Sequence, residues 1–101
     1  MTMKERFPAL RQFFACYLHE DWMLEVENWQ GVVLGYLKTE PPDLVRSATN
    51  QLGQFLAMDL KGEHLEEALD ELGNCYSPRP EKSYEAWLHE LFRFLRDHPP
   101  G

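Results

Sequence analysis

The sequence has few cysteines and no long apolar run. Its two cysteines, Cys16 and Cys75, have neither CxxC spacing nor the density of a disulfide scaffold, which predicts reduced thiols in a cytosolic protein. No apolar stretch approaches the ~20 residues of a membrane span, and the amino-terminal MTMKERFPAL lacks the apolar core of a signal peptide. These absences predict a soluble, cytoplasmic protein with no membrane partner.

Basic residues are scarce in the middle of the chain. The whole sequence holds 17 acidic and 10 basic residues, a net charge of −7. Residues 12–78 contain twelve acidic residues but only three basic ones, Lys38, Arg46 and Lys61. Because nucleic-acid phosphates require clustered lysine and arginine, this balance argues against a nucleic-acid ligand and favours a basic protein partner.

Motifs that hold cofactors or perform catalysis are also missing. The chain has no HExxH pair, no phosphate-binding glycine loop and no dinucleotide fingerprint, and its four histidines are isolated in sequence. A nucleophilic cysteine would need an electropositive setting, whereas this chain is acidic. We therefore expect no enzyme activity, no cofactor and no metal; the catalytic alternative, built on His19, Glu20 and Asp21, requires turnover that is lost in His19→Ala.

What the sequence does contain is apolar residues at helical spacing, with no sustained strand alternation. Five blocks show this spacing, each bounded by residues that end helices: 7–18, 29–37, 44–56, 65–72 and 84–95. The length of 101 residues fits one domain with its own hydrophobic core. The pattern predicts an all-α, compact single-domain bundle of about five short helices over residues 1–101, with residues 97–101 as a frayed tail.

Helix ends are predicted by their capping residues. Asn28 and Ser83 stand where N-caps are needed, and Gly73 with Asn74 ends the fourth helix. In TEPPD, Thr39 is expected to cap the third helix, with the two prolines in its first turn.

The run YLHEDW follows the first predicted helix. Its Trp22 has two interpretations: it fills the gap between the first two helices, or it is an exposed aromatic anchor ringed by carboxylates, suited to a cationic protein partner. Tyr76, in the proline-bearing loop NCYSPRPEK, either joins this anchor or closes the end of the last helix.

The chain resembles the immunity proteins of bacterial contact-dependent growth inhibition systems. The resemblance rests on three segments that cover most of the chain: FPALRQFFACYLHEDWMLE, YLKTEPPD and ELGNCYSPRPEKSYEAWLHEL. The residues that match are Tyr17, His19, Asp21, Trp22, Glu40, Pro41, Pro42, Ser83, Tyr84, Trp87 and Leu88. The resemblance implies a small cytosolic protein that neutralises a cognate toxin C-terminal domain by binding it as a monomer in a 1:1 complex.

The partner-binding residues are expected mainly outside the shared pattern, because recognition of one toxin resides in differences between relatives. Shared aromatic residues such as Tyr84 and Trp87 are then scaffold. An acidic surface would steer a basic toxin, such as a nuclease, into contact. The predicted partner-binding residues are Glu63, Glu66, Glu67, Asp70 and Glu71, then Glu20, Asp21, Trp22, Glu25, Glu27 and Tyr76. The alternative is an acidic helical adaptor unrelated to toxin immunity, which a growth-rescue assay would distinguish.

Overall fold

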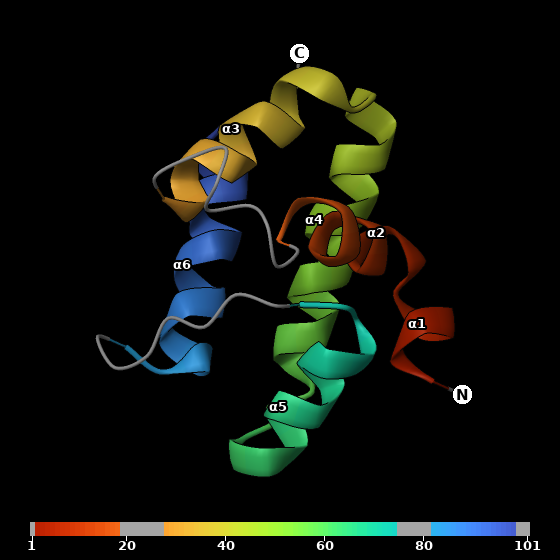
Figure 1. Ribbon diagram of the computed structural model, residues 1–101, viewed down its shortest axis with the longest axis vertical. Helices are drawn as coiled ribbons and strands as arrows, with labels where there is room; N and C mark the ends of the chain where they lie inside the picture. The colour runs from red at the N-terminus through yellow and green to blue at the C-terminus, as the bar shows by residue number, and fades with distance from the viewer. Residues whose placement is uncertain (1, 19–27, 75–81, 99–101) are drawn as a thin grey trace.

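The structure, a computed structural model, describes residues 2–18, 28–74 and 82–98, and its regular elements there are all helices. They are α1 (Met3–Arg6), α2 (Pro8–Tyr17), α3 (Trp29–Thr39), α4 (Pro42–Ala57), α5 (Gly62–Glu71) and α6 (Tyr84–Asp97) (Figure 1). The five predicted helices are all present, and the single turn of α1 precedes them. The all-α prediction is confirmed.

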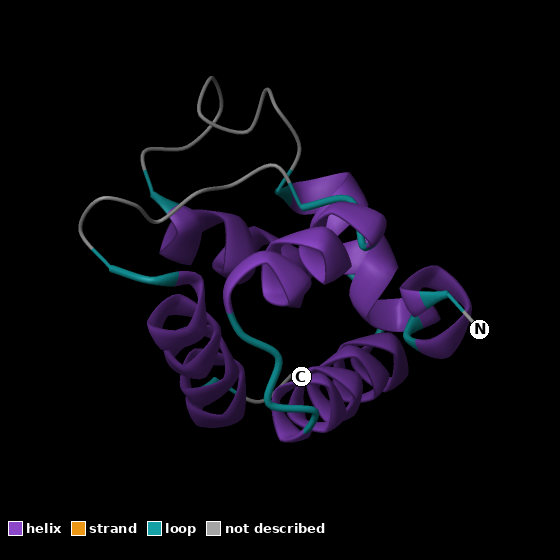
Figure 2. Ribbon diagram, turned by 90° about the horizontal axis from the view of Figure 1, so that it is seen from below, coloured by secondary structure: helices purple, strands orange, loops and turns teal. Residues whose placement is uncertain are grey.

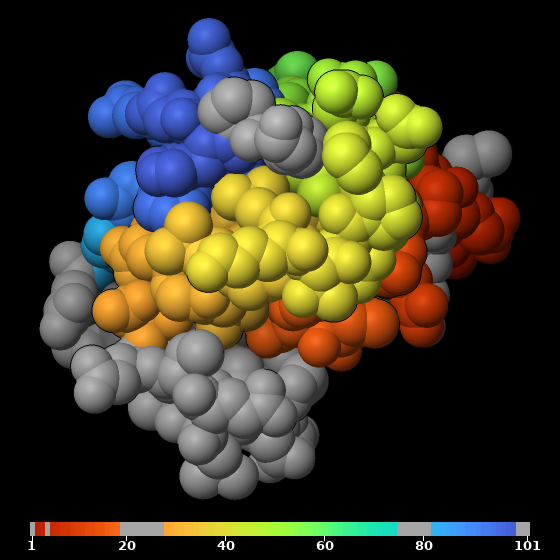
Figure 3. Space-filling model, turned by 90° about the horizontal axis from the view of Figure 1, so that it is seen from above, coloured from red at the N-terminus to blue at the C-terminus, as the bar shows by residue number. Residues whose placement is uncertain are grey.

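The longest helix, α4, lies at the centre of the arrangement. It packs against α2 and α6, while α2 also contacts α1 and α3, and α1 contacts α5. Figure 1 shows α6 alongside α4 and running in the opposite direction, with α5 at the end where α4 finishes and α6 begins. Figure 2 shows the helices from below. At the other end, α3, the start of α4 and the end of α6 form the surface (Figure 3). The acidic helix α5 is thereby held away from α3.

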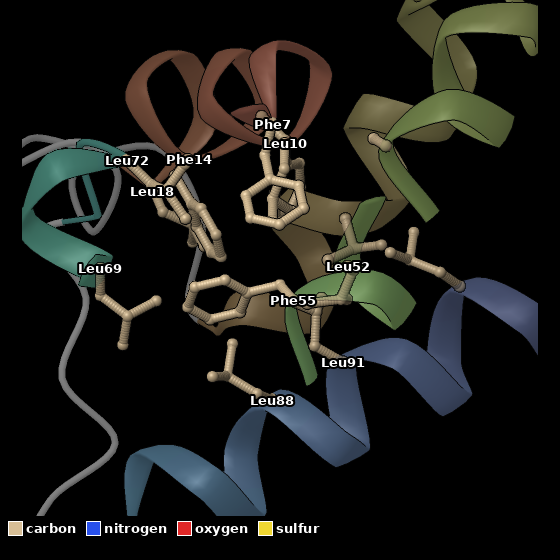
Figure 4. Close-up of a cluster of buried hydrophobic side chains, with 14 of the residues drawn as sticks. Phe7, Leu10, Phe14, Leu18, Leu52, Phe55, Leu69, Leu72, Leu88 and Leu91 are labelled. Carbon is tan, nitrogen blue, oxygen red and sulfur yellow. The ribbon is translucent and has the colours of Figure 1, made fainter. Parts of the chain in front are cut away.

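One hydrophobic core joins the helices. The apolar stripes predicted from the sequence point inward, and side chains from α2, α4, α5 and α6 converge in Figure 4. Phe55 of α4 meets the ring of Phe7 edge-on, with 5.8 Å between ring centroids. Phe14 of α2 lies 6.2 Å from the Trp87 ring of α6. The buried core residues are Phe7, Ala9, Leu10, Phe13, Phe14, Leu18, Trp29, Val32, Val33, Tyr36, Val45, Ala48, Leu52, Phe55, Leu65, Ala68, Leu69, Leu72, Trp87, Leu88, Leu91 and Leu95.

Three predicted helix ends are confirmed. The Asn28 side chain accepts a hydrogen bond from the Gly31 backbone N–H at 2.8 Å, and the Ser83 hydroxyl accepts one from Ala86 at 3.1 Å. Gly73, with φ +84°, follows α5 in the left-handed conformation. Its N–H donates to the Asp70 carbonyl and the next N–H donates to the Leu69 carbonyl, which is the Schellman pattern.

One predicted boundary is wrong. Thr39 does not cap α4 but is the last residue of α3. Glu40 and Pro41 are extended instead, because a residue that precedes proline is sterically disfavoured from helical geometry, and Pro42 then begins α4. At the other end of the chain, Asp97 is the last residue of α6 and His98 is its C-cap, and residues 99–101 of the predicted tail lie outside the described residues.

The first turn of α2 is capped from a distant helix. Its N-cap residue, Phe7, makes no side-chain capping bond. Instead the Gln51 side-chain oxygen, from α4, accepts hydrogen bonds from the backbone N–H groups of Ala9 at 2.9 Å and Leu10 at 3.1 Å. These are the N–H groups that a local N-cap would normally satisfy. Gln51 therefore links the N-terminal end of α2 to α4.

A second polar contact joins α2 to the turn after α3. The Tyr17 hydroxyl donates to Glu40 Oε1 at 2.6 Å. Burial, followed by the hydrogen bond and the negative charge of Glu40, raises the pKa of Tyr17 to about 12. The neighbouring Tyr36 ring is fully buried, 5.0 Å from that of Tyr17, and burial raises its pKa as well. Its hydroxyl finds no hydrogen-bond partner in the described part of the chain.

Candidate partner-binding surface

The outer face of α5 is exposed and acidic. Leu65, Ala68 and Leu69 face the core, so the intervening positions face solvent. Glu63, Glu67, Asp70 and Glu71 are exposed, and Glu66 is partly buried. The helix contains no lysine or arginine. The predicted acidic face therefore exists as a contiguous side of α5, and it lies at one end of the molecule (Figure 1).

A recess lies beside this helix, between the end of α4, the α4–α5 turn and the start of α6. Its volume is ≈ 300 Å³. It is lined by Phe55, Leu56, Asp59, Leu60, Lys61, Leu65, Glu85, Leu88 and His89. Buried or half-buried apolar side chains form much of this lining, while Asp59, Lys61 and His89 are exposed and Glu85 is partly exposed. The recess thus combines apolar surface with carboxylates from two separate elements, the turn and α6.

The Glu85 carboxylate also borders a second recess of ≈ 220 Å³, which includes Gly62, Glu66, Ser83 and Tyr84. A third, of ≈ 560 Å³, lies between α4 and α6. Its lining contains Thr49, Asn50, Gly53, Gln54, Ala57, Phe92 and Arg96, with no carboxylate. Carboxylates therefore line the recesses beside α5 and not the one between α4 and α6. A further recess of ≈ 200 Å³, between α3 and α6, contains Glu90 and Asp97 together with Arg93.

Residues 6–95 match the protein family described as CdiI immunity protein. The match spans both the buried helices and the acidic surface. The chain belongs to the CdiI immunity protein family. This finding confirms the family resemblance seen in the sequence, and the family is named for immunity rather than for a catalysed reaction.

A solved structure shares the fold of this CdiI-family protein. A chain in "Crystal structure of CdiA-CT/CdiI complex from Y. kristensenii 33638" has a TM-score of 0.83 and 23% sequence identity to it. The alignment covers 95% of this chain and 99% of that chain. Among curated protein sequences, none matches this chain. The shared helical architecture extends over nearly the whole length of both chains.

The predicted binding residues of this CdiI protein fall into two groups. The acidic residues of α5 are together on one surface, as described above. The others lie outside the described residues: Glu20, Asp21, Trp22, Glu25, Glu27 and Tyr76. The recess carboxylates Asp59 and Glu85 were not predicted, and only one signal pointed to them: each is an acidic residue beside a helix terminus.

The shared aromatic residues of the family pattern are largely internal. Trp87 is fully buried, and its ring meets that of Trp29 edge-on at 6.3 Å between centroids. Tyr84 is partly buried and packs against the core. The expected scaffold role of Trp87 is confirmed, since a fully buried side chain cannot contact a partner.

The described residues contain no group of three or more His, Cys, Asp or Glu side chains that could hold one metal ion. Cys16 is an exposed free thiol on α2. None of the helices in the described ranges has both the length and the apolar character of a membrane span.

Proposed function

We propose that this CdiI-family protein binds and neutralises a cognate contact-dependent growth inhibition toxin, as a monomer in a 1:1 complex in the cytosol. The observation that carries the proposal is the family match over residues 6–95. The solved relative supports it, since its crystal structure is that of a CdiA-CT/CdiI complex. Inhibition requires only stoichiometric binding and no reaction by the immunity protein.

The charge of the surface favours a basic toxin domain, as a nuclease would be. The acids on the outer face of α5 stand at one end of the protein, where they create a negative potential that attracts a positively charged partner. Such steering raises association rates toward ~10⁸ M⁻¹s⁻¹ or more at low salt. Fast capture matters because a free toxin acts on the cell that contains it.

A growth-rescue experiment tests the proposal. The toxin domain encoded beside this protein is expressed in bacteria with and without the immunity protein, and the two proteins are then co-purified by size exclusion. Growth restored together with a 1:1 complex is the expected result. The absence of both growth rescue and a complex would contradict the proposed function. A complex without rescue would favour the adaptor alternative.

The salt dependence of association tests the electrostatic part. Raising the ionic strength from about 0.1 M to 1 M shortens the Debye length from about 10 Å to 3 Å, so the association rate constant should fall steeply. Stopped-flow mixing of the two proteins measures it. A rate constant that does not change with salt would exclude steering by the acidic surface.

A further inference from the structure

The recess beside α5 has the size of a site for one or two side chains. Its volume of ≈ 300 Å³ is at the lower end of the range for ligand pockets, about 300–1,000 Å³. Phe55, Leu65 and Leu88 are buried in the core, and Leu56 and Leu60 are half-buried beside them. An occupant would therefore need an apolar portion to lie against this lining.

The carboxylates at the recess are poorly neutralised by the protein itself. The Glu85 side chain makes no hydrogen bond or ion pair within residues 2–18, 28–74 and 82–98. Asp59 lies 3.9 Å from the Lys61 ammonium, but the two side chains are 81% and 71% exposed. An ion pair this exposed is worth little, so a better-placed cation could replace Lys61. The recess therefore offers two carboxylates to an incoming positive charge.

The backbone at Asp59 does not require that charge. Asp59 has φ +54°, a left-handed conformation that Gly, Asn and Asp tolerate better than other residues. Asn would fit the turn equally well, and Gly would fit it with less strain. The geometry of the turn accounts for a residue of this kind but does not require a carboxylate, so the charge of Asp59 is available for an interaction.

We propose that this recess receives an arginine side chain of the toxin domain, an inference that rests on the proposed function. The aliphatic stem lies against Leu56 and Leu60, and the guanidinium reaches the carboxylates of Asp59 and Glu85. Arginine suits this site because its planar group carries five donors and is weakly hydrated, while its stem is apolar. Arginine is also among the residues that dominate binding energy at protein interfaces.

The other large recess does not fit such an occupant. The one between α4 and α6 is wider, at ≈ 560 Å³, but has no carboxylate. Its cation, Arg96, is 5.5 Å from the centroid of the Phe92 ring, so a second guanidinium there would meet a like charge. The recess between α3 and α6 has the carboxylates Glu90 and Asp97, but it is smaller, at ≈ 200 Å³, and is also lined by Arg93. Its Glu90 is already paired with Lys82. Charge complementarity therefore favours the recess beside α5.

A pair of matched double variants tests the proposal. Asp59→Asn with Glu85→Gln removes two charges at the recess and preserves the side-chain shapes. The control, Asp43→Asn with Asp97→Asn, removes two charges from the far ends of the same helices, α4 and α6. At 1.5 Å per residue these control positions lie roughly 18–24 Å along the helices from the recess. Both variants therefore change the net charge equally.

Dissociation of the toxin domain is the deciding measurement. Surface plasmon resonance should show the recess variant dissociating about 10- to 100-fold faster than the unaltered protein, because a partner's buried charge is left unpaired. The control should change the dissociation rate less than about 2-fold, since exposed charges contribute little. Urea midpoints equal to that of the unaltered protein would show that neither variant has lost its fold.

The outcomes separate this inference from the proposed function. If the unaltered protein binds the toxin and both variants dissociate at its rate, the recess is not the arginine site, and the proposed function stands. If the unaltered protein neither binds nor rescues, the proposed function itself fails. Lys61→Gln gives a change of opposite sign: removing the competing cation should slow dissociation about 2- to 5-fold, and an unchanged or faster rate would contradict the placement beside Asp59.

Discussion

Replacing Gln51 by alanine should destabilise the protein more than any similar change on the same helix. The substitution removes the oxygen that accepts from Ala9 and Leu10, and so leaves two N–H groups at the start of α2 without that partner. Each hydrogen bond contributes about 0.5–1.5 kcal/mol net, which predicts a loss of about 1–3 kcal/mol. That is a large part of the 5–15 kcal/mol typical of a whole domain.

Gln54→Ala is the matched control. Gln54 is also on α4, but its side chain is exposed and makes no hydrogen bond within the described ranges. Its replacement should change the free energy of unfolding by less than about 0.5 kcal/mol. Urea unfolding followed by far-ultraviolet circular dichroism measures both variants. Equal stability of Gln51→Ala and Gln54→Ala would refute the view that Gln51 caps α2.

A third variant, Gln51→Glu, tests the same contact with the opposite expectation. A carboxylate would accept the same two N–H bonds and would lie at the positive end of the α2 dipole, a gain of about 0.3–1 kcal/mol at neutral pH. Because these partners favour the charged form, they lower the carboxyl pKa in the folded state. The gain in stability should be present above the pKa that this carboxyl has in the unfolded chain. It should be lost as the pH falls through the lower pKa of the carboxyl in the folded protein.

Three further perturbations test other features of the fold. Gly73→Ala should cost about 2–4 kcal/mol in urea unfolding, since φ is +84° and the new Cβ would lie 3.0 Å from the Ala15 Cβ; a cost below 1 kcal/mol would contradict this. Tyr36→Phe should leave stability unchanged or raise it by about 1 kcal/mol, because it removes a buried hydroxyl without a described partner, and a clear loss would reveal a partner. The contribution of Tyr17 to the free energy of unfolding should be fully present below pH 10 and should fall as the pH rises toward 12. The reason is that the unfolded chain releases the Tyr17 proton first, at the ordinary pKa of 10. Tyr17→Phe should lose less stability over that interval in urea titrations, and an identical loss would exclude this cause.

The sequence determined which segments are helices and where most of them end. Apolar spacing acts within one helix, and the caps at Asn28 and Ser83 act within its first turn, so both are visible in a short window of sequence. The family pattern was visible for a similar reason, because it is a linear order of residues. The predicted Thr39 cap was wrong because two local preferences competed: the capping preference of Thr39 and the extended conformation that proline imposes on the residue before it.

Only the tertiary structure decided how distant residues meet. Gln51 reads as an ordinary polar helix residue, and its capping role depends on α4 passing the first turn of α2, more than 40 positions away in the chain. Asp59 and Glu85 likewise form one recess because α6 returns beside the end of α4. Periodicity shows that a helix has a buried face, but not which helix covers it, since many packings bury the same apolar area. The contacts between helices therefore had to come from the fold.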